Sequence, residues 1–191
     1  MLNKILFITL SNIGDCILTL PVLDALRERF PKAKVTVMVG PRAKEIFEAN
    51  PYIDKLIIYD KYMPLRKKIK LFFILKKEDF DLVVDLRNTL YGALLPAHSK
   101  TSPFLRLPSN IQHMKERNLY RLYRALKMRP STAYTTTNKS LFISQQDKDY
   151  IKHLLEINNI NSKDKIVIIS AVARGAARRW GKENFVRLSE G

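Results

Sequence analysis

The chain has 191 residues, and its 34 lysines and arginines outnumber its 18 aspartates and glutamates, which leaves a formal net charge of +16. Its single cysteine excludes an internal disulfide bond, and no apolar stretch approaches the roughly 20 residues needed to span a bilayer. The charge favours an acidic partner, whether nucleic acid, an anionic membrane surface or a phosphorylated substrate.

The beginning of the chain predicts a strand, a short turn and a helix. Residues 5–10 are almost continuously apolar, which is typical of a strand buried on both faces of a parallel sheet. A polar turn at residues 11–15 contains one glycine, and a helical pattern follows through residue 30. Pro21 falls early in that pattern and is expected to kink or restart the helix. In α/β domains built from such units, ligands bind at the carboxyl ends of the strands.

Asp15 lies where the first strand has ended and the helix begins, so we expect it to face this binding crevice. One interpretation is structural, with the carboxylate capping the helix N-terminus. The other is functional, with the carboxylate acting as a general base on a bound hydroxyl group. The residues alone leave both open.

Three further apolar segments predict strands at residues 35–39, 55–59 and 80–86. A short helix is expected at residues 42–49, and the connection at 61–77 must also contain a helix if the sheet is parallel. This alternation predicts an α/β fold, a Rossmann-like doubly wound parallel sheet with helices on both faces.

Residues 61–77 hold seven lysines or arginines and no acidic residue, with apolar residues interleaved. Such a basic amphipathic helix can lie on an anionic membrane, with its apolar face buried and its cations on phosphates. It can equally be a crossover helix that packs on the sheet and leaves its lysines in solvent. The two interpretations are compatible.

The fourth predicted strand ends in Asp85, and Arg87 and Asn88 follow it, at the same sheet edge as Asp15. A loop-rich region comes next, and then a helix over residues 113–126. This helix carries Arg117, Arg121 and Arg124 on one ridge, which is either a solvated face or an anion clamp near the crevice. His113 at its start is a candidate catalytic residue, although a lone histidine more often caps a helix or packs.

The remaining residues predict a second strand–turn–helix unit. A short strand at 141–143 and a helix from 144 to 157 are followed by a polar segment, which we interpret as an inter-domain linker. A buried strand is predicted at 165–170 and a helix from Trp180. We therefore expect an N-terminal domain at residues 1–160 and an incomplete second Rossmann-like domain at 161–191, as in a fragment of a longer protein.

Two motifs resemble glycosyltransferase family 9, the ADP-heptose:lipopolysaccharide heptosyltransferases, which have the two-domain GT-B fold. The first runs from Ser11 to Pro21 and continues through Phe30-Pro31 into the strand at 35–39. The second is a turn from Ser170 to Gly175, followed by Arg178-Arg179-Trp180-Gly181. Three residues depart from the family pattern in the second motif, where a hydroxyl-bearing residue, a lysine and a proline are replaced by Ala173, Arg178 and Gly181.

The resemblance implies a heptosyltransferase that transfers a sugar from a nucleotide-sugar, ADP-heptose, to a lipopolysaccharide core acceptor with inversion. Asp15 would be the catalytic base. The acceptor would be bound by Ser11, Asn12, Gly14, His113, Arg117 and Arg121. The nucleotide-sugar would be bound by Ser170, Arg174 and Arg178, although the family's downstream donor motif is absent and the 191-residue chain alone is expected to be inactive.

The same resemblance implies a metal-independent reaction without a resident cofactor. The expected location is the cytoplasm, with peripheral association at the inner face of the inner membrane. The alternative hypothesis is a non-catalytic basic α/β module that binds nucleic acid or an anionic glycolipid. No RNA-binding signature supports the nucleic-acid version.

Overall fold

The computed structural model describes residues 2–128, 141–161, 163–170 and 180–190. Its contacts divide the chain into two compact units, Met1–Ser144 and Gln145–Gly191. The division falls earlier than the domain boundary predicted at residue 160, so the helix at 145–157 belongs to the second unit. The predicted boundary between an acceptor-side and a nucleotide-sugar domain stays a prediction.

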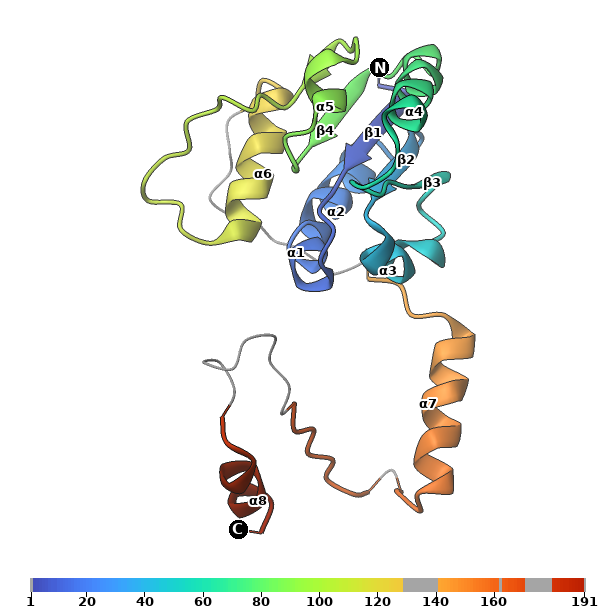
Figure 1. Ribbon diagram of the computed structural model, residues 1–191, viewed down its shortest axis with the longest axis vertical. Helices are drawn as coiled ribbons and strands as arrows, with labels where there is room; N and C mark the ends of the chain where they lie inside the picture. Colours follow the sequence, from blue (N-terminus) through green and yellow to red (C-terminus); the bar gives the residue numbers. More distant parts are fainter. Residues whose placement is uncertain (1, 129–140, 162, 171–179, 191) are drawn as a thin grey trace. The chain divides into compact units, whose positions relative to one another are not determined.

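The first unit contains a parallel sheet of five strands in the order β3-β2-β1-β4-β5 (Figure 1). The strands are β1 (Lys4–Ile8), β2 (Lys34–Val39), β3 (Lys55–Ile58), β4 (Leu82–Asp85) and β5 (Ser99–Lys100). The chain moves from β1 outward to β3 and then returns to β4 on the other side of β1. This reversal places a topological switch point at the carboxyl ends of β1 and β4, where doubly wound folds bind ligands.

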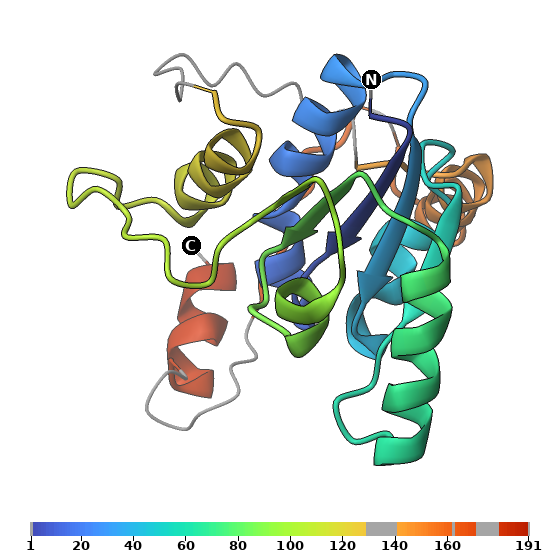
Figure 2. The same cartoon turned by 90° about the horizontal axis from the view of Figure 1, so that it is seen from above.

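Helices cover both faces of the sheet, as predicted (Figure 2). They are α1 (Ile13–Ile17), α2 (Leu20–Arg29), α3 (Lys44–Glu48), α4 (Leu65–Lys77), α5 (Leu90–Leu94) and α6 (Met114–Ala125), with a 3₁₀ turn η1 at Pro41–Ala43. The helix α5 and the two-residue strand β5 lie in the region that the sequence predicts to be loop-rich.

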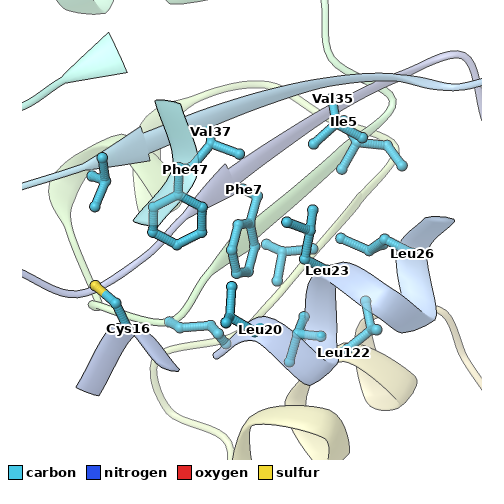
Figure 3. Packing of buried hydrophobic residues seen from close by; sticks show 14 of the residues in the cluster. Ile5, Phe7, Cys16, Leu20, Leu23, Leu26, Val35, Val37, Phe47 and Leu122 are labelled. Atoms are coloured by element: carbon cyan, nitrogen blue, oxygen red, sulfur yellow. The ribbon is translucent and has the colours of Figure 1, made fainter. Parts of the chain in front are cut away.

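Alternate residues of β1 enter two separate cores, because successive side chains of a strand point to opposite faces. Ile5 and Phe7 pack with residues of α2, α3 and α6, as Figure 3 shows. Leu6 and Ile8 pack on the other face with residues of α4 and α5. The strand is therefore buried on both sides, as its apolar run predicted.

The helical pattern after the first turn is broken into α1 and α2, with Pro21 in the first turn of α2. Proline is tolerated there because the first N–H groups of a helix have no partner within the helix. Buried Thr19 stabilises the turn between α1 and α2, since its Oγ1 donates a hydrogen bond to the carbonyl of Cys16 (2.7 Å). Of the two predicted effects of Pro21, the structure shows a restart.

The second unit contains α7 (Gln145–Ile157) and α8 (Lys182–Glu190), which confirms both predicted helices. The strand predicted at residues 165–170 is wrong, because this segment has no ladder partner among the described residues and its apolar side chains are exposed. The short strand predicted at 141–143, which lies in the first unit, is wrong for the same reason. A strand forms only where a neighbour accepts its backbone hydrogen bonds. No helix in the described part of the chain is long and apolar enough to cross a membrane.

Candidate active site at the carboxyl edge of the sheet

Asp15 lies in the first turn of α1, directly beyond the carboxyl end of β1, and its side chain is exposed. The Nδ2 of Asn12 donates to Oδ2 of Asp15 at 2.9 Å. Asn12, and not Asp15, occupies the N-cap position of α1. The carboxylate is thus oriented by a neighbouring amide and open to solvent, an arrangement that suits a base waiting for a bound hydroxyl.

Two glycines shape the approach to this turn. A Cβ on Gly14 would meet no heavy atom within 4 Å, so this face of α1 is open. A Cβ on Gly40 would come within 2.6 Å of the Ser11 Oγ, so only glycine lets the end of β2 lie against Ser11. The turn is therefore packed against the sheet on one side and free on the side of Gly14.

The base of the turn is fixed by buried groups. The hydroxyl groups of Thr9 and Thr19 form a 2.7 Å hydrogen bond, and the Cys16 thiol donates to the carbonyl of Leu10. Burial raises the pKa of the Cys16 thiol to about 11. This cysteine therefore stays protonated at neutral pH and holds structure rather than acting as a nucleophile.

Asp85 at the end of β4 is buried and organises the turn that follows it. Its carboxylate accepts hydrogen bonds from the backbone N–H groups of Arg87 (2.9 Å) and Thr89 (2.6 Å) and from the Thr89 hydroxyl. Gly92 of α5 is a glycine because a Cβ there would collide with this carboxylate. Burial raises the pKa of Asp85. With its oxygens committed to this turn, Asp85 is a poorer candidate base than Asp15.

Arginines gather at the same edge. Arg87 follows β4 and stacks over the Tyr59 ring at 5.2 Å, while Arg121 of α6 lies 3.5 Å from the Oδ1 of Asn88. Desolvation, followed by the positive charge of Arg117, lowers the pKa of Arg121. The Nε of Arg117 is buried without a hydrogen-bond partner in the described chain. Two half-buried cations one helical turn apart favour a bound anion, so Arg117 and Arg121 fit the predicted anion clamp.

Helix α6 is held to the turn between α1 and α2 by Asn118, whose Nδ2 donates to the carbonyl of Leu18 (3.2 Å). Asn118 is buried, and neither it nor Arg87 was among the residues predicted to bind the acceptor. Arg87 could have been included from its position directly after a strand. The role of Asn118 depends on how α6 packs, which no local pattern indicates.

His113 is the N-cap residue of α6, and its Nδ1 accepts a hydrogen bond from the backbone N–H of Lys115 at 3.2 Å. This is the capping role that the sequence offered as the alternative to catalysis. Arg124, on the same predicted ridge as Arg117 and Arg121, is exposed.

The predicted nucleotide-sugar residues belong to the second unit. Ser170 is exposed and lies in a segment without regular structure. Arg174 and Arg178, together with Ala173, lie outside the described residues. Among the residues that are described, no three histidine, cysteine or acidic side chains are grouped to hold a metal ion.

No family model matches the chain. It is 28% identical over 198 residues to lipopolysaccharide heptosyltransferase 3 of Escherichia coli strain K12, covering 92% of this chain and 56% of that protein. A second lipopolysaccharide heptosyltransferase 3 from Escherichia coli is 33% identical over 87 residues, 43% of this chain and 26% of the relative. The matches thus span about half of the first relative and a quarter of the second.

Solved structures agree in fold. A glycosyl transferase family 9 protein from Veillonella parvula matches with a TM-score of 0.76 and 21% identity, over 97% of this chain and 58% of that one. The E. coli heptosyltransferase WaaC with ADP matches with a TM-score of 0.67 and 15% identity, over 98% of this chain and 63% of that one. The fold is that of the Rossmann-like N-terminal half of a GT-B enzyme, and the resemblance of the chain to glycosyltransferase family 9 is confirmed.

Proposed function

We propose that this chain is the acceptor-side part of an inverting glycosyltransferase that transfers heptose from ADP-heptose to a lipopolysaccharide core acceptor. The relatives are heptosyltransferases by name, and WaaC has been solved with ADP and with ADP-2-deoxy-2-fluoro heptose. The single observation that carries the proposal is the exposed carboxylate of Asp15, held by Asn12 at the carboxyl end of the central strand β1.

In the proposed reaction, Asp15 takes the proton of an acceptor hydroxyl group. The hydroxyl oxygen then forms a bond to the anomeric carbon, while the bond from that carbon to the diphosphate breaks and its electron pair leaves with ADP. Attack from the face opposite the leaving group inverts the configuration. The Asn12 amide orients the carboxylate, and the open face at Gly14 lets the acceptor approach closely.

The arginines have the complementary role of holding an acidic acceptor. Arg117 and Arg121, with Arg87 at the end of β4, would bind carboxylate or phosphate groups of the lipopolysaccharide core, for which the planar guanidinium fork is well suited. Ser170, Arg174 and Arg178 are proposed to contact the nucleotide-sugar. The positive charge of Arg178 and Arg174 would balance the negative charge that develops on the departing diphosphate and so take the part of a metal ion, which makes the proposed reaction metal-independent.

The proposed site of action is the cytoplasmic face of the inner membrane, where the chain would associate peripherally through its basic surface. Seven cations and no acidic residue in residues 61–77 support an attraction to anionic lipid. The attraction should weaken as salt rises, because a Debye length of about 8 Å at physiological ionic strength screens exposed charges.

The test replaces Asp15 with asparagine in the active form of the protein. Asn12 can still hydrogen-bond to the new amide, but asparagine cannot accept the proton, and loss of a general base typically costs about 10²–10⁴-fold in rate. Turnover of ADP-heptose and a lipopolysaccharide core acceptor, followed by mass spectrometry, should collapse in Asp15→Asn, while acceptor binding to the 191-residue chain stays within a few-fold.

Asp79→Asn is the matched control. Asp79 is also exposed, precedes β4 at the opposite edge of the sheet, and has a positive φ of 52° that asparagine tolerates well. Turnover by Asp15→Asn within a few-fold of the control would remove the proposed base. Salt-sensitive but sequence-blind DNA binding without any lipopolysaccharide binding would instead favour the non-catalytic basic module.

A further inference from the structure

An apolar groove of about 580 Å³ opens beside the carboxyl edge of the sheet, between α4 and α5. Its volume lies within the range of pockets that bind small molecules. The apolar lining comes from Leu65, Ile69, Phe72, Phe73, Leu90 and Leu94. Arg87, which belongs to the proposed acceptor site, and Asn88, which accepts a hydrogen bond from Arg121, also line the groove, so the groove adjoins that site.

Most of the apolar side chains of the groove wall are exposed and lie outside the core. Leu65, Ile69 and Phe73 repeat every four residues along α4, and Leu65 is 70% exposed. On α5, Leu90 is 76% exposed, and Leu94 follows one turn later. The opposite face of α4 contributes Leu75 to the core. The Tyr91 hydroxyl donates to the carbonyl of Lys68 (3.1 Å), which joins the two helices and keeps the groove formed.

The charged groups of the groove are all cationic. Lys61, Lys68 and Arg87 line it, and none of the described acidic side chains does. The Lys68 ammonium donates to the carbonyl of Lys61 at 2.8 Å and keeps two N–H groups for a ligand. Nearby Asp60 directs its Oδ1 to the backbone N–H of Tyr62, within its own turn. A ligand that fits must combine a long apolar part with an anionic group.

We propose that this groove binds one acyl chain of a phosphorylated lipid, with the phosphate held by Lys61, Lys68 and Arg87. The inference rests on the proposed function, because an acyl chain here would anchor the lipid end of an acceptor whose sugar end reaches Asp15. It goes beyond adsorption to a charged surface, since it assigns a defined hydrocarbon site with its own polar rim.

Monoalkyl phosphates of increasing chain length, kept below their critical micelle concentrations, are the probes for the 191-residue chain. Each added methylene that enters the groove should tighten binding about fourfold, until the groove is filled. Calorimetry should show this series for the alkyl phosphates and only weak binding of inorganic phosphate. An affinity that does not change with chain length, or that equals that of inorganic phosphate, would overturn the proposal.

Leu94→Glu places a carboxylate in the groove, and Phe104→Glu is its control. Phe104 is 92% exposed and is not among the groove residues, so both variants exchange an exposed apolar side chain for the same charge. Leu94→Glu should weaken octyl phosphate binding at least tenfold, and Phe104→Glu by less than twofold. Equal losses would point to net charge alone and would contradict a defined site.

Two further experiments distinguish lipid binding in the groove from dimer formation and from failure of the proposed function. If the groove instead joins two copies of the chain, wild type will sediment as a dimer and Leu94→Glu as a monomer, which would overturn the lipid site.

In the active form of the protein, Leu94→Glu should raise the KM for an acylated acceptor and leave turnover of its deacylated form unchanged. If the unmutated protein turns over neither acceptor, the proposed function is refuted. The alkyl phosphate series tests the groove independently of that result.

Discussion

Residues 4–8 and 165–169 have similar sequences, Lys-Ile-Leu-Phe-Ile and Lys-Ile-Val-Ile-Ile, and different structures. The first is β1, the central strand of a five-stranded sheet, paired with β2 on one side and β4 on the other. The second has no regular structure, and its Ile168 is 89% exposed where Phe7 of β1 is fully buried. An apolar run therefore favours burial, but it forms a buried strand only where neighbouring strands pair with it.

The surroundings of β1 explain the difference. Asp81 accepts hydrogen bonds from the backbone N–H groups of Asn3 (2.7 Å) and Lys4 (2.9 Å), so even the start of the strand has its donors satisfied. Helices then cover both faces of the sheet. Residues 165–170 lie in a unit whose described regular elements are α7 and α8, and neither can supply a ladder of strand hydrogen bonds.

The largest effect is expected where β1 is buried most completely. Phe7→Ala should lower the free energy of unfolding of the first unit by about 3–5 kcal/mol, because it removes a buried ring and leaves a cavity between β1, α2 and α3. Urea unfolding followed by far-ultraviolet circular dichroism would measure the change. A loss below about 1 kcal/mol would mean that β1 is not the organising strand of this core.

A smaller, pH-dependent effect is expected at the start of β1. Hydrogen bonds from the Asn3 and Lys4 N–H groups hold the pKa of Asp81 below the ordinary value of 3.8. A lowered pKa means that the folded state binds protons less readily than the unfolded state, so the stabilisation is present above pH 3.8 and is lost as the pH falls through the folded-state value.

Asp81→Asn should therefore destabilise the protein by about 1 kcal/mol at pH 7, an estimate scaled to a partly exposed charge-assisted hydrogen bond. The difference between wild type and variant should shrink as the pH falls below 3.8. Urea unfolding of both proteins across this pH range provides the measurement. A difference that is the same at pH 7 and pH 3 would assign the effect to packing rather than to the carboxylate.

The smallest effect is expected in the unpaired segment. Ile168→Ala should change stability by less than about 0.5 kcal/mol, because an exposed side chain without strand neighbours has little burial to lose. Trp180 is the single tryptophan of the chain and lies in the second unit, so its fluorescence reports on that unit alone. A loss of 2 kcal/mol or more by this signal would show that residues 165–170 are buried against another element.

Much of the first unit was predictable from local pattern. The strands that begin at residues 4, 34, 55 and 82, their alternation with helices and the restart at Pro21 all follow from runs of apolar residues and from the rigid φ of proline. The exposed position of Asp15 after β1 also followed, because a polar turn at the end of a parallel strand lies at the binding edge.

Other features depended on contacts between distant residues. Asn118 reaches the carbonyl of Leu18, one hundred positions away, and Asp85 turns inward to serve its own loop instead of the crevice. The groove between α4 and α5 exists because two apolar stripes, each unremarkable alone, face one another across Tyr91. Local sequence determined which segments could be strands, helices and turns, since period and polarity are local properties. Tertiary structure decided which apolar runs were buried and which polar groups met, because pairing and packing join residues that the sequence keeps apart.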